Sequence, residues 1–190
     1  YEDGRYDDAW RVYLRSLEIN IAPDRAYDRA FALNGLGIVS HRRGDLQQAQ
    51  EHLNAAIEIR RADRDSGALA ASLTNLAMVK IDTRELAEAT ALLKDSVKMR
   101  WSREEMRGLN EAFAGLARIA EITGQHLISA ELIGTIDHLT RRGHRLPRPV
   151  ATELETTRIR VANVLERDQF ESSVATGRTR SLQETVEFAL

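Results

Sequence analysis

The feature that most constrains the fold is a set of four landmark positions that recur every forty residues. A fixed period of this length is typical of stacked helical repeats, in which each unit buries its apolar face against its neighbours. The first functional question is therefore which surface such a stack presents, and to which partner. The four columns are Gly4, Gly44, Arg84, Gly124; Ala9, Ala49, Ala89, Ser129; Tyr13, Leu53, Leu93, Ile133; and Ser16, Ala56, Ser96, Ile136.

Three further columns predict how the helices of one unit meet. Two large apolar residues at i and i+3 followed by a very small one at i+4 form one helical stripe, and the small residue lets a second helix approach closely. A turn follows seven residues later, and the alanine column then opens the partner helix, so each unit is predicted to be a helix hairpin. The stripe consists of Leu33, Leu73, Phe113; Leu36, Leu76, Leu116; and Gly37, Ala77, Ala117.

These patterns, with the breaks at the glycines and prolines of the C-terminal part, predict ten helices. We expect them at about residues 6–19, 25–42, 46–62, 67–82, 85–99, 103–122, 126–142, 150–166, 168–176 and 182–189.

Local signals at the predicted helix ends agree with this assignment. Asp24 and Asp45 stand where N-caps belong, and Gly44 and Gly124 end helices without the steric penalty of a Cβ atom. Arg84 replaces the turn glycine of its unit, so we expect that turn to be differently shaped. Two capping boxes are predicted, Ser102 with Glu105 and Ser181 with Glu184.

The sequence predicts an all-α fold, an α-α superhelix of helix hairpins with a C-terminal helical cap. A half repeat covers residues 1–22, and full repeats cover about 23–62, 63–102 and 103–143. The period fails where Gly143, Pro147 and Pro149 interrupt the helix, so residues 144–190 are expected to cover the end of the stack.

Composition excludes several classes of function. The hydrophobic fraction of 43% is enough for a sizeable core, and the formal net charge of -2 gives no global attraction to nucleic acid or to an anionic membrane. The absence of cysteine excludes disulfides, thiolate nucleophiles and cysteine zinc sites. With no long apolar run, we expect a cytoplasmic location, no membrane partner and no direct nucleic-acid binding.

The spacing of small residues resembles the tetratricopeptide repeat. In that family a small residue is followed after seven residues by glycine, after five more by alanine, and after a further seven by another small residue. Gly37, Gly44, Ala49 and Ala56 match this motif, with Leu33, Leu36, Leu46 and Leu53 as the large packing positions. The usual period is 34 residues, so the helices here are expected to be longer than standard.

The C-terminal segment resembles the one that closes the tetratricopeptide region of LuxR-type and maltose-regulator-like multidomain transcriptional regulators, which are bacterial signalling ATPases. The resemblance implies a regulatory arm whose ATPase and output domains, DNA-binding or cyclase, lie outside these residues. The matching residues are Ala130, Leu132, Gly134, Leu146, Pro147, Glu153, Phe170, Ala175, Gly177, Arg178, Ser181, Leu182, Glu184, Val186, Ala189 and Leu190.

No motif for catalysis, cofactor binding or metal binding is found. A Gly-rich phosphate loop with lysine is absent from the sequence, and no two histidines have the i+3 or i+4 spacing that would direct both at one metal. We therefore expect neither an enzyme nor a cofactor. The one local concentration of charge, Arg141 to Arg148, has two interpretations. It is a contact for an anion, a nucleic acid or an acidic partner domain, or it is a solvated helix end whose arginines complement the helix dipole.

The better candidate site is the concave groove that the first helices of such repeats line, where a peptide or helix of a partner protein would bind. Ile38 and Met78 could seat an apolar anchor, or they could simply pack between repeats. Both occupy the asparagine position of the carboxylate clamp of some tetratricopeptide domains, so binding of chaperone tails is disfavoured. The predicted lining residues are Phe31, Asn34, Ile38, His41, Thr74, Met78, Ile81, Glu111, Ala114, Arg118 and Glu121.

The first repeat is represented only by its second helix, with Tyr6, Ala9, Tyr13 and Leu17 on the apolar face. Together with the absence of an initiating methionine, this predicts a fragment of a longer chain and possible self-association through the uncovered helix. Two readings of function are open. One is a sensor arm that relays partner or effector binding to ATPase and output domains, and the other is a free-standing scaffold without a role in transcription.

Overall fold

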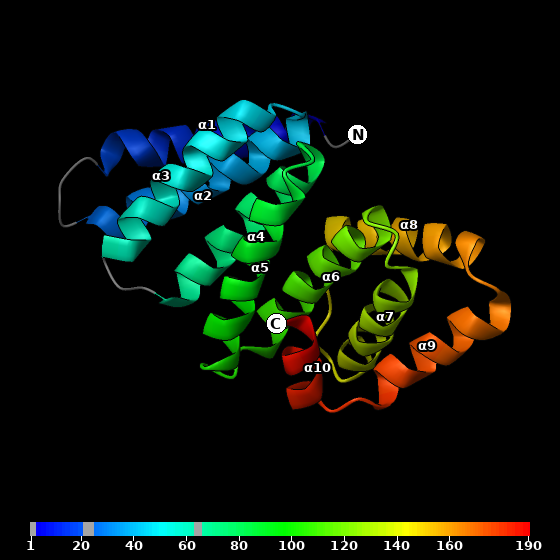
Figure 1. The fold of residues 1–190 in the computed structure, drawn as a ribbon. Helices are drawn as coiled ribbons and strands as arrows, with labels where there is room; N and C mark the ends of the chain where they lie inside the picture. Colours follow the sequence, from blue (N-terminus) through cyan, green and yellow to red (C-terminus); the bar gives the residue numbers. More distant parts are fainter. Residues whose placement is uncertain (1–2, 21–24, 63–65) are drawn as a thin grey trace. The chain divides into compact units, whose positions relative to one another are not determined.

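The computed structural model describes residues 3–20, 25–62 and 66–190, and within these ranges the regular secondary structure is helical, with no strand (Figure 1). The ten expected helices all form, none with a boundary more than three residues from its predicted position. They are α1 (Asp3–Ile19), α2 (Ala26–Arg43), α3 (Leu46–Ala62), α4 (Ser66–Asp82), α5 (Leu86–Trp101), α6 (Met106–Ile122), α7 (His126–Arg141), α8 (Arg148–Val164), α9 (Arg167–Thr179) and α10 (Leu182–Ala189).

The chain divides into two compact units, Tyr1–Leu92 and Leu93–Leu190. The division lies within α5. In the second unit, α8 and α9 pack closely against α6 and α7. The change from repeats to cap at about residue 143 stays a prediction.

In the first unit, glycines on α2 set how closely the neighbouring helices approach. A Cβ atom at Gly35 would lie 2.4 Å from the Tyr13 ring of α1, and one at Gly37 would lie 2.5 Å from Leu53 Cγ of α3. Leu33 and Leu36 are buried beside them. The predicted stripe is confirmed on α2, and it is the surface on which α2 and α3 pair.

The ends of five helices share one hydrogen-bonding pattern. One to three residues after each of these helices, a residue adopts a positive φ: Gly44, Arg84, Glu104, Gly124 and Gly143. Its N–H donates to the carbonyl three residues back, and the next N–H donates to the carbonyl five residues back. This is the Schellman motif. Its first four observed positions are separated by multiples of twenty residues, half the repeat.

Two of the local predictions at helix ends were wrong. The turn at Arg84 has the same hydrogen bonds as the turn at Gly44, so it is not differently shaped; instead a non-glycine residue adopts a φ of 66°. Ser102 and Glu105 form no capping box, because α6 starts only at Met106 and Ser102 Oγ donates to the Met99 carbonyl oxygen, 2.8 Å away.

The remaining predictions at helix ends agree with the structure where it describes them. Ser181 Oγ accepts the Glu184 N–H at 3.2 Å and the Glu184 carboxylate accepts the Ser181 N–H at 2.8 Å, which confirms this capping box. Asp45 immediately precedes α3, and its carbonyl oxygen accepts the Ala49 N–H. Asp24 lies outside the described residues.

In the second unit, α7 and α9 cross at two glycines. A Cβ atom at Gly134 would lie 2.1 Å from the Val174 carbonyl oxygen, and one at Gly177 would lie 1.8 Å from the Glu131 carbonyl oxygen. Thr135 Oγ1 donates to the Gly177 carbonyl oxygen at 3.0 Å. No larger residue fits at this crossing without moving the two backbones apart.

Three ion pairs hold the C-terminal helices to α7. The Asp137 carboxylate accepts from Arg158 of α8 at 2.6 Å and from Arg178 of α9 at 2.7 Å, and Glu131 pairs with Arg180 at 2.6 Å. One carboxylate on α7 thus fixes two helices at once. Within the described residues, none of the helices combines the length and the apolar character that a bilayer span requires.

We predict that Arg84→Gly stabilises the protein by about 0.5 to 1 kcal/mol, because glycine adopts positive φ without the steric cost that Arg84 incurs. The Arg84 side chain is exposed, so little packing is lost. Denaturant unfolding followed by circular dichroism measures the change. The matched control is Gly44→Ala at the equivalent turn, which should destabilise by about 1 kcal/mol. Destabilisation by both substitutions would contradict this account of the turns.

Candidate functional site

One exposed apolar surface of the first unit is a strip along α2. Tyr27 and Phe31 are 60% and 54% exposed and Ile38 is 38% exposed, at i, i+4 and i+11 on one side of the helix. The Phe31 ring meets the Tyr13 ring of α1 edge to face, with centroids 6.1 Å apart. We call Tyr27, Phe31 and Ile38 the α2 strip. Its side chains are held by the helix and, at Phe31, by a second aromatic ring.

Asn34 lies on the same side of α2, but its side chain forms hydrogen bonds with neighbouring helices. Its Oδ1 accepts from Ser72 Oγ at 2.8 Å, from Asn75 Nδ2 at 3.2 Å and from Arg60 Nη1 at 3.4 Å. Arg60 is buried, and its Nη1 also donates to the Ala68 carbonyl oxygen at 2.7 Å. This network joins α2, α3 and α4. The Asn34 oxygen, predicted to bind a ligand, is therefore already occupied by three donors.

His41 and Met78 complete this side of the first unit. His41 Nε2 lies 2.6 Å from the Asp82 carboxylate and so connects the ends of α2 and α4. Because Asn34 meets Asn75 and His41 meets Asp82, the intervening Ile38 and Met78 lie beside each other, and both have solvent-accessible surface. That they line a ligand groove stays a prediction.

Two predicted lining residues of α4 belong to the core instead. Thr74 and Ile81 are buried, and Thr74 Oγ1 donates to the Ala70 carbonyl oxygen one turn earlier, at 3.1 Å. Neither side chain is accessible to a ligand here. The apolar face of α4 is wider than the repeat pattern suggested, since nearly every residue from Leu69 to Ile81 has little exposure.

In the second unit, the predicted lining residues of α6 are covered by α8. Arg118 Nε lies 3.0 Å from Glu153 Oε1 of α8, and Glu121 Oε2 lies 3.6 Å from Arg160 Nη1. Ala114 is buried. The groove predicted along this helix is therefore filled by the chain itself, and these residues hold α8 in place.

Glu111, the remaining predicted residue, lines a shallow cleft of about 470 Å³ with Arg100, Glu105, Gly108 and His144. Arg100 is largely buried: its Nη1 lies 3.4 Å from Glu105 Oε2 and its Nε lies 3.3 Å from Ser96 Oγ. Burial lowers the pKa of Arg100, an effect that Glu111 and Glu105 oppose. A Cβ atom at Gly108 would lie 1.6 Å from the Arg100 guanidinium, so the arginine rests on the backbone of α6.

Arg60 and Arg100 were not predicted from the sequence. They are forty residues apart, at the same position of consecutive repeats, and each reaches the first turns of the following helix. Their forty-residue spacing is a signal in the sequence that could have identified them. The aligned columns contained only small and apolar positions and so left this one out.

The basic run lies at the end of α7 and the start of α8. Arg141 and Arg142 are exposed at the C-terminal end of α7, where positive charge complements the helix dipole. Arg148 is exposed in the first turn of α8, where the dipole does not favour a cation. Within the described part of the chain, no group of three histidine, aspartate or glutamate residues could hold a metal ion.

Comparison with known families agrees with this geometry. The sequence model of the tetratricopeptide repeat matches residues 1–62 and 28–100, which together make up more than half of the chain. The chain belongs to the tetratricopeptide-repeat family. This membership and the all-helical structure confirm the predicted all-α superhelical class.

A protein-interaction role follows from this family, whose fold is typically a non-catalytic scaffold. No curated protein matches the chain. In this tetratricopeptide-repeat protein, α2 and α4 are the first helices of their hairpins, and the α2 strip lies on one of them.

We predict that Asn34→Ala costs about 1 to 3 kcal/mol of stability, because it removes the acceptor of the buried Ser72 hydroxyl and one of the acceptors of Arg60. The matched control on the same side of α2 is Phe31→Leu, which should change stability by less than about 1 kcal/mol. Denaturant unfolding of both variants measures the difference. Equal effects would show that the Asn34 network does not hold these helices together.

Proposed function

We propose that the first unit binds a partner protein by receiving an apolar segment of it on the α2 strip, next to Met78. The supporting observation is the exposure of three large apolar side chains on one side of α2, in a family that interacts with proteins. Large exposed apolar patches of this kind are typical of interaction sites.

The chemistry of this surface favours apolar contact over polar recognition. The Asn34 oxygen is taken up by three donors, and His41 is engaged with Asp82. What these helices leave available are the Phe31 ring, Ile38 and the flexible Met78 side chain, which adapts to different apolar shapes. A helix or peptide with apolar side chains at i and i+4 or i+7 matches such a strip.

We also propose that this chain is the interaction arm of a larger bacterial transcriptional or signalling regulator, which relays partner or effector binding to ATPase and output domains. The support is the resemblance of residues 130–190 to the segment that closes the repeats of LuxR-type regulators. Residues 144–190 would then act as the cap of a repeat region that ends at about residue 143. The arm itself carries no catalytic role.

The native sequence on either side of Tyr1 and Leu190 tests this context. A phosphate-binding loop upstream supports the regulator. If only further repeats are found there, the regulator is ruled out and the alternative holds, a free-standing scaffold that binds peptides or proteins with no transcriptional role.

We predict that Phe31→Glu and Ile38→Glu each weaken peptide binding at least about tenfold, because a charge on the strip must be desolvated in the complex. A displayed library of random peptides selected on the wild-type chain supplies the ligands, and fluorescence polarisation measures their affinities. Selected peptides should share apolar residues at helical spacing.

The control for this experiment is Ile159→Glu, which places the same charge at an exposed apolar position of α8. Peptides that bind both strip variants and the control as tightly as the wild type would rule out the α2 strip as the binding site. Unchanged circular dichroism spectra confirm that the variants are folded.

A further inference from the structure

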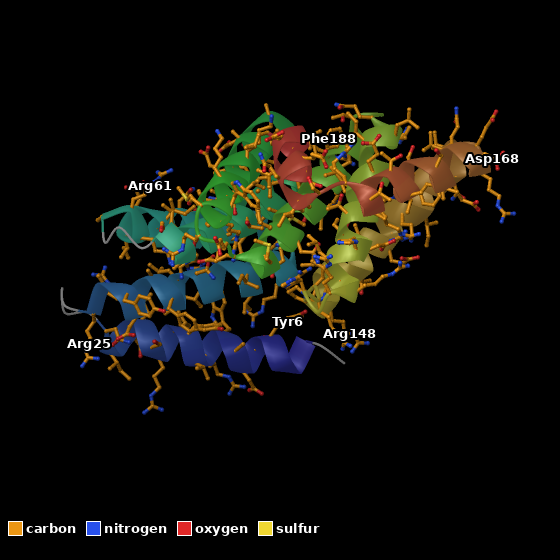
Figure 2. The ribbon with its side chains drawn as sticks, turned by 90° about the horizontal axis from the view of Figure 1, so that it is seen from below. Tyr6, Arg25, Arg61, Arg148, Asp168 and Phe188 are labelled. Carbon is orange, nitrogen blue, oxygen red and sulfur yellow. The ribbon has the colours of Figure 1, made fainter. Side chains whose placement is uncertain are left out.

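The outward side of α1 carries a second, separate apolar surface. Val12 and Ile19, one heptad apart, are 66% and 67% exposed, and the exposed Asp8 and Arg15 lie between and beside them on the same side of the helix. In Figure 2 the α1 ribbon lies at the edge of its unit, with α2 beside it. We call these four residues the α1 face.

The repeat itself shows what this side of a second helix does. Forty residues on, Val12 corresponds to His52 of α3 and Ile19 corresponds to Ile59. His52 meets Trp10 of the preceding α1 edge to face, with ring centroids 5.6 Å apart, and Ile59 is only partly exposed. Burial lowers the pKa of His52, as expected for a ring packed between helices. In α3, therefore, this side of the helix includes a contact with a neighbouring helix.

The charges on the α1 face are complementary to those of an antiparallel copy. A two-fold axis between residues 11 and 12 places Asp8 opposite Arg15 of the second copy, and Arg15 opposite its Asp8. Val12 then lies against the aliphatic part of Arg11 of the second copy. A parallel copy would instead place Asp8 against Asp8 and Arg15 against Arg15, which is unfavourable. Among the residues whose side chains the structure describes, Asp8 pairs with Arg11 of its own helix, at 2.7 Å and with both side chains largely exposed.

We propose that the α1 face is a docking site for a second copy of this chain, packed antiparallel across α1. Tyr13, one of the inner residues that the sequence suggested for self-association, packs on Gly35 of α2 instead. Self-association then involves the opposite side of the same helix.

Sedimentation equilibrium of the purified 190-residue chain over a range of concentrations tests the proposal. We expect a monomer–dimer equilibrium whose dissociation constant rises at least about tenfold in the double variant Val12→Ala with Ile19→Ala, because apolar contact area is lost on both copies and no new charge is introduced. The matched control Ile159→Ala, at an exposed apolar position of α8, should leave the equilibrium unchanged. A monomer at every concentration overturns the proposal, as does a dimer that the double variant leaves intact.

A charge exchange separates an antiparallel dimer of copies from any other self-association. Asp8→Arg alone should raise the dissociation constant about threefold or more, since both cross-pairs become repulsive. Combining Asp8→Arg with Arg15→Asp restores the cross-pairs and should restore the wild-type value. If the double exchange associates no better than the single variant, the antiparallel arrangement is wrong. Circular dichroism spectra of all variants report whether α1 remains helical.

Discussion

The rest of the structure depends on helices that approach each other at positions without a side chain. At Gly37 the neighbouring Leu53 side chain occupies the space where a Cβ atom would stand, and at Gly177 that space is filled by a carbonyl oxygen of α7. Such approaches bring two helix surfaces into full contact and exclude water between them. They also fix where along the helix the contact occurs, because a shift by one residue would place a larger side chain at the crossing.

Buried polar groups then fix where along the following helix each hairpin packs. Burying an arginine is costly unless its donors are all satisfied, so a buried guanidinium tolerates few alternative arrangements. Arg60 meets its partners on α2 and α4 in a single geometry, and Arg100 rests on α6 where Gly108 leaves room. Apolar columns bring the helices together, and these arginines determine which turn of the following helix they meet.

Much of this fold could be predicted from the forty-residue period, because hairpin helices and their glycine contacts are local consequences of repeated residues. The site could be predicted only in part. Phe31, Ile38 and Met78 are accessible as expected, but Arg118 and Glu121 are covered by α8, whose position no repeat column encodes. In the sequence, Asn34 looked available to a ligand. Its partners, Ser72 and Arg60, occupy other positions of the repeat, and no column connects them with Asn34. The Arg84 turn shows the opposite error: its sequence departs from the pattern while its backbone keeps it.

The two surfaces proposed for the first unit are compatible with each other. Tyr13, which supports Phe31 of the α2 strip, is the residue next to Val12, and consecutive residues of a helix point about 100° apart. The α1 face is therefore turned away from the strip, and a second copy docked on α1 leaves both strips open. A dimer of this kind would present two identical apolar sites. A partner with two matching segments would then bind more tightly than one strip allows, because the second contact is made within the same complex. Apolar strips with few polar contacts gain most from this arrangement, since each strip alone supplies little of the directional hydrogen bonding that distinguishes one partner from another.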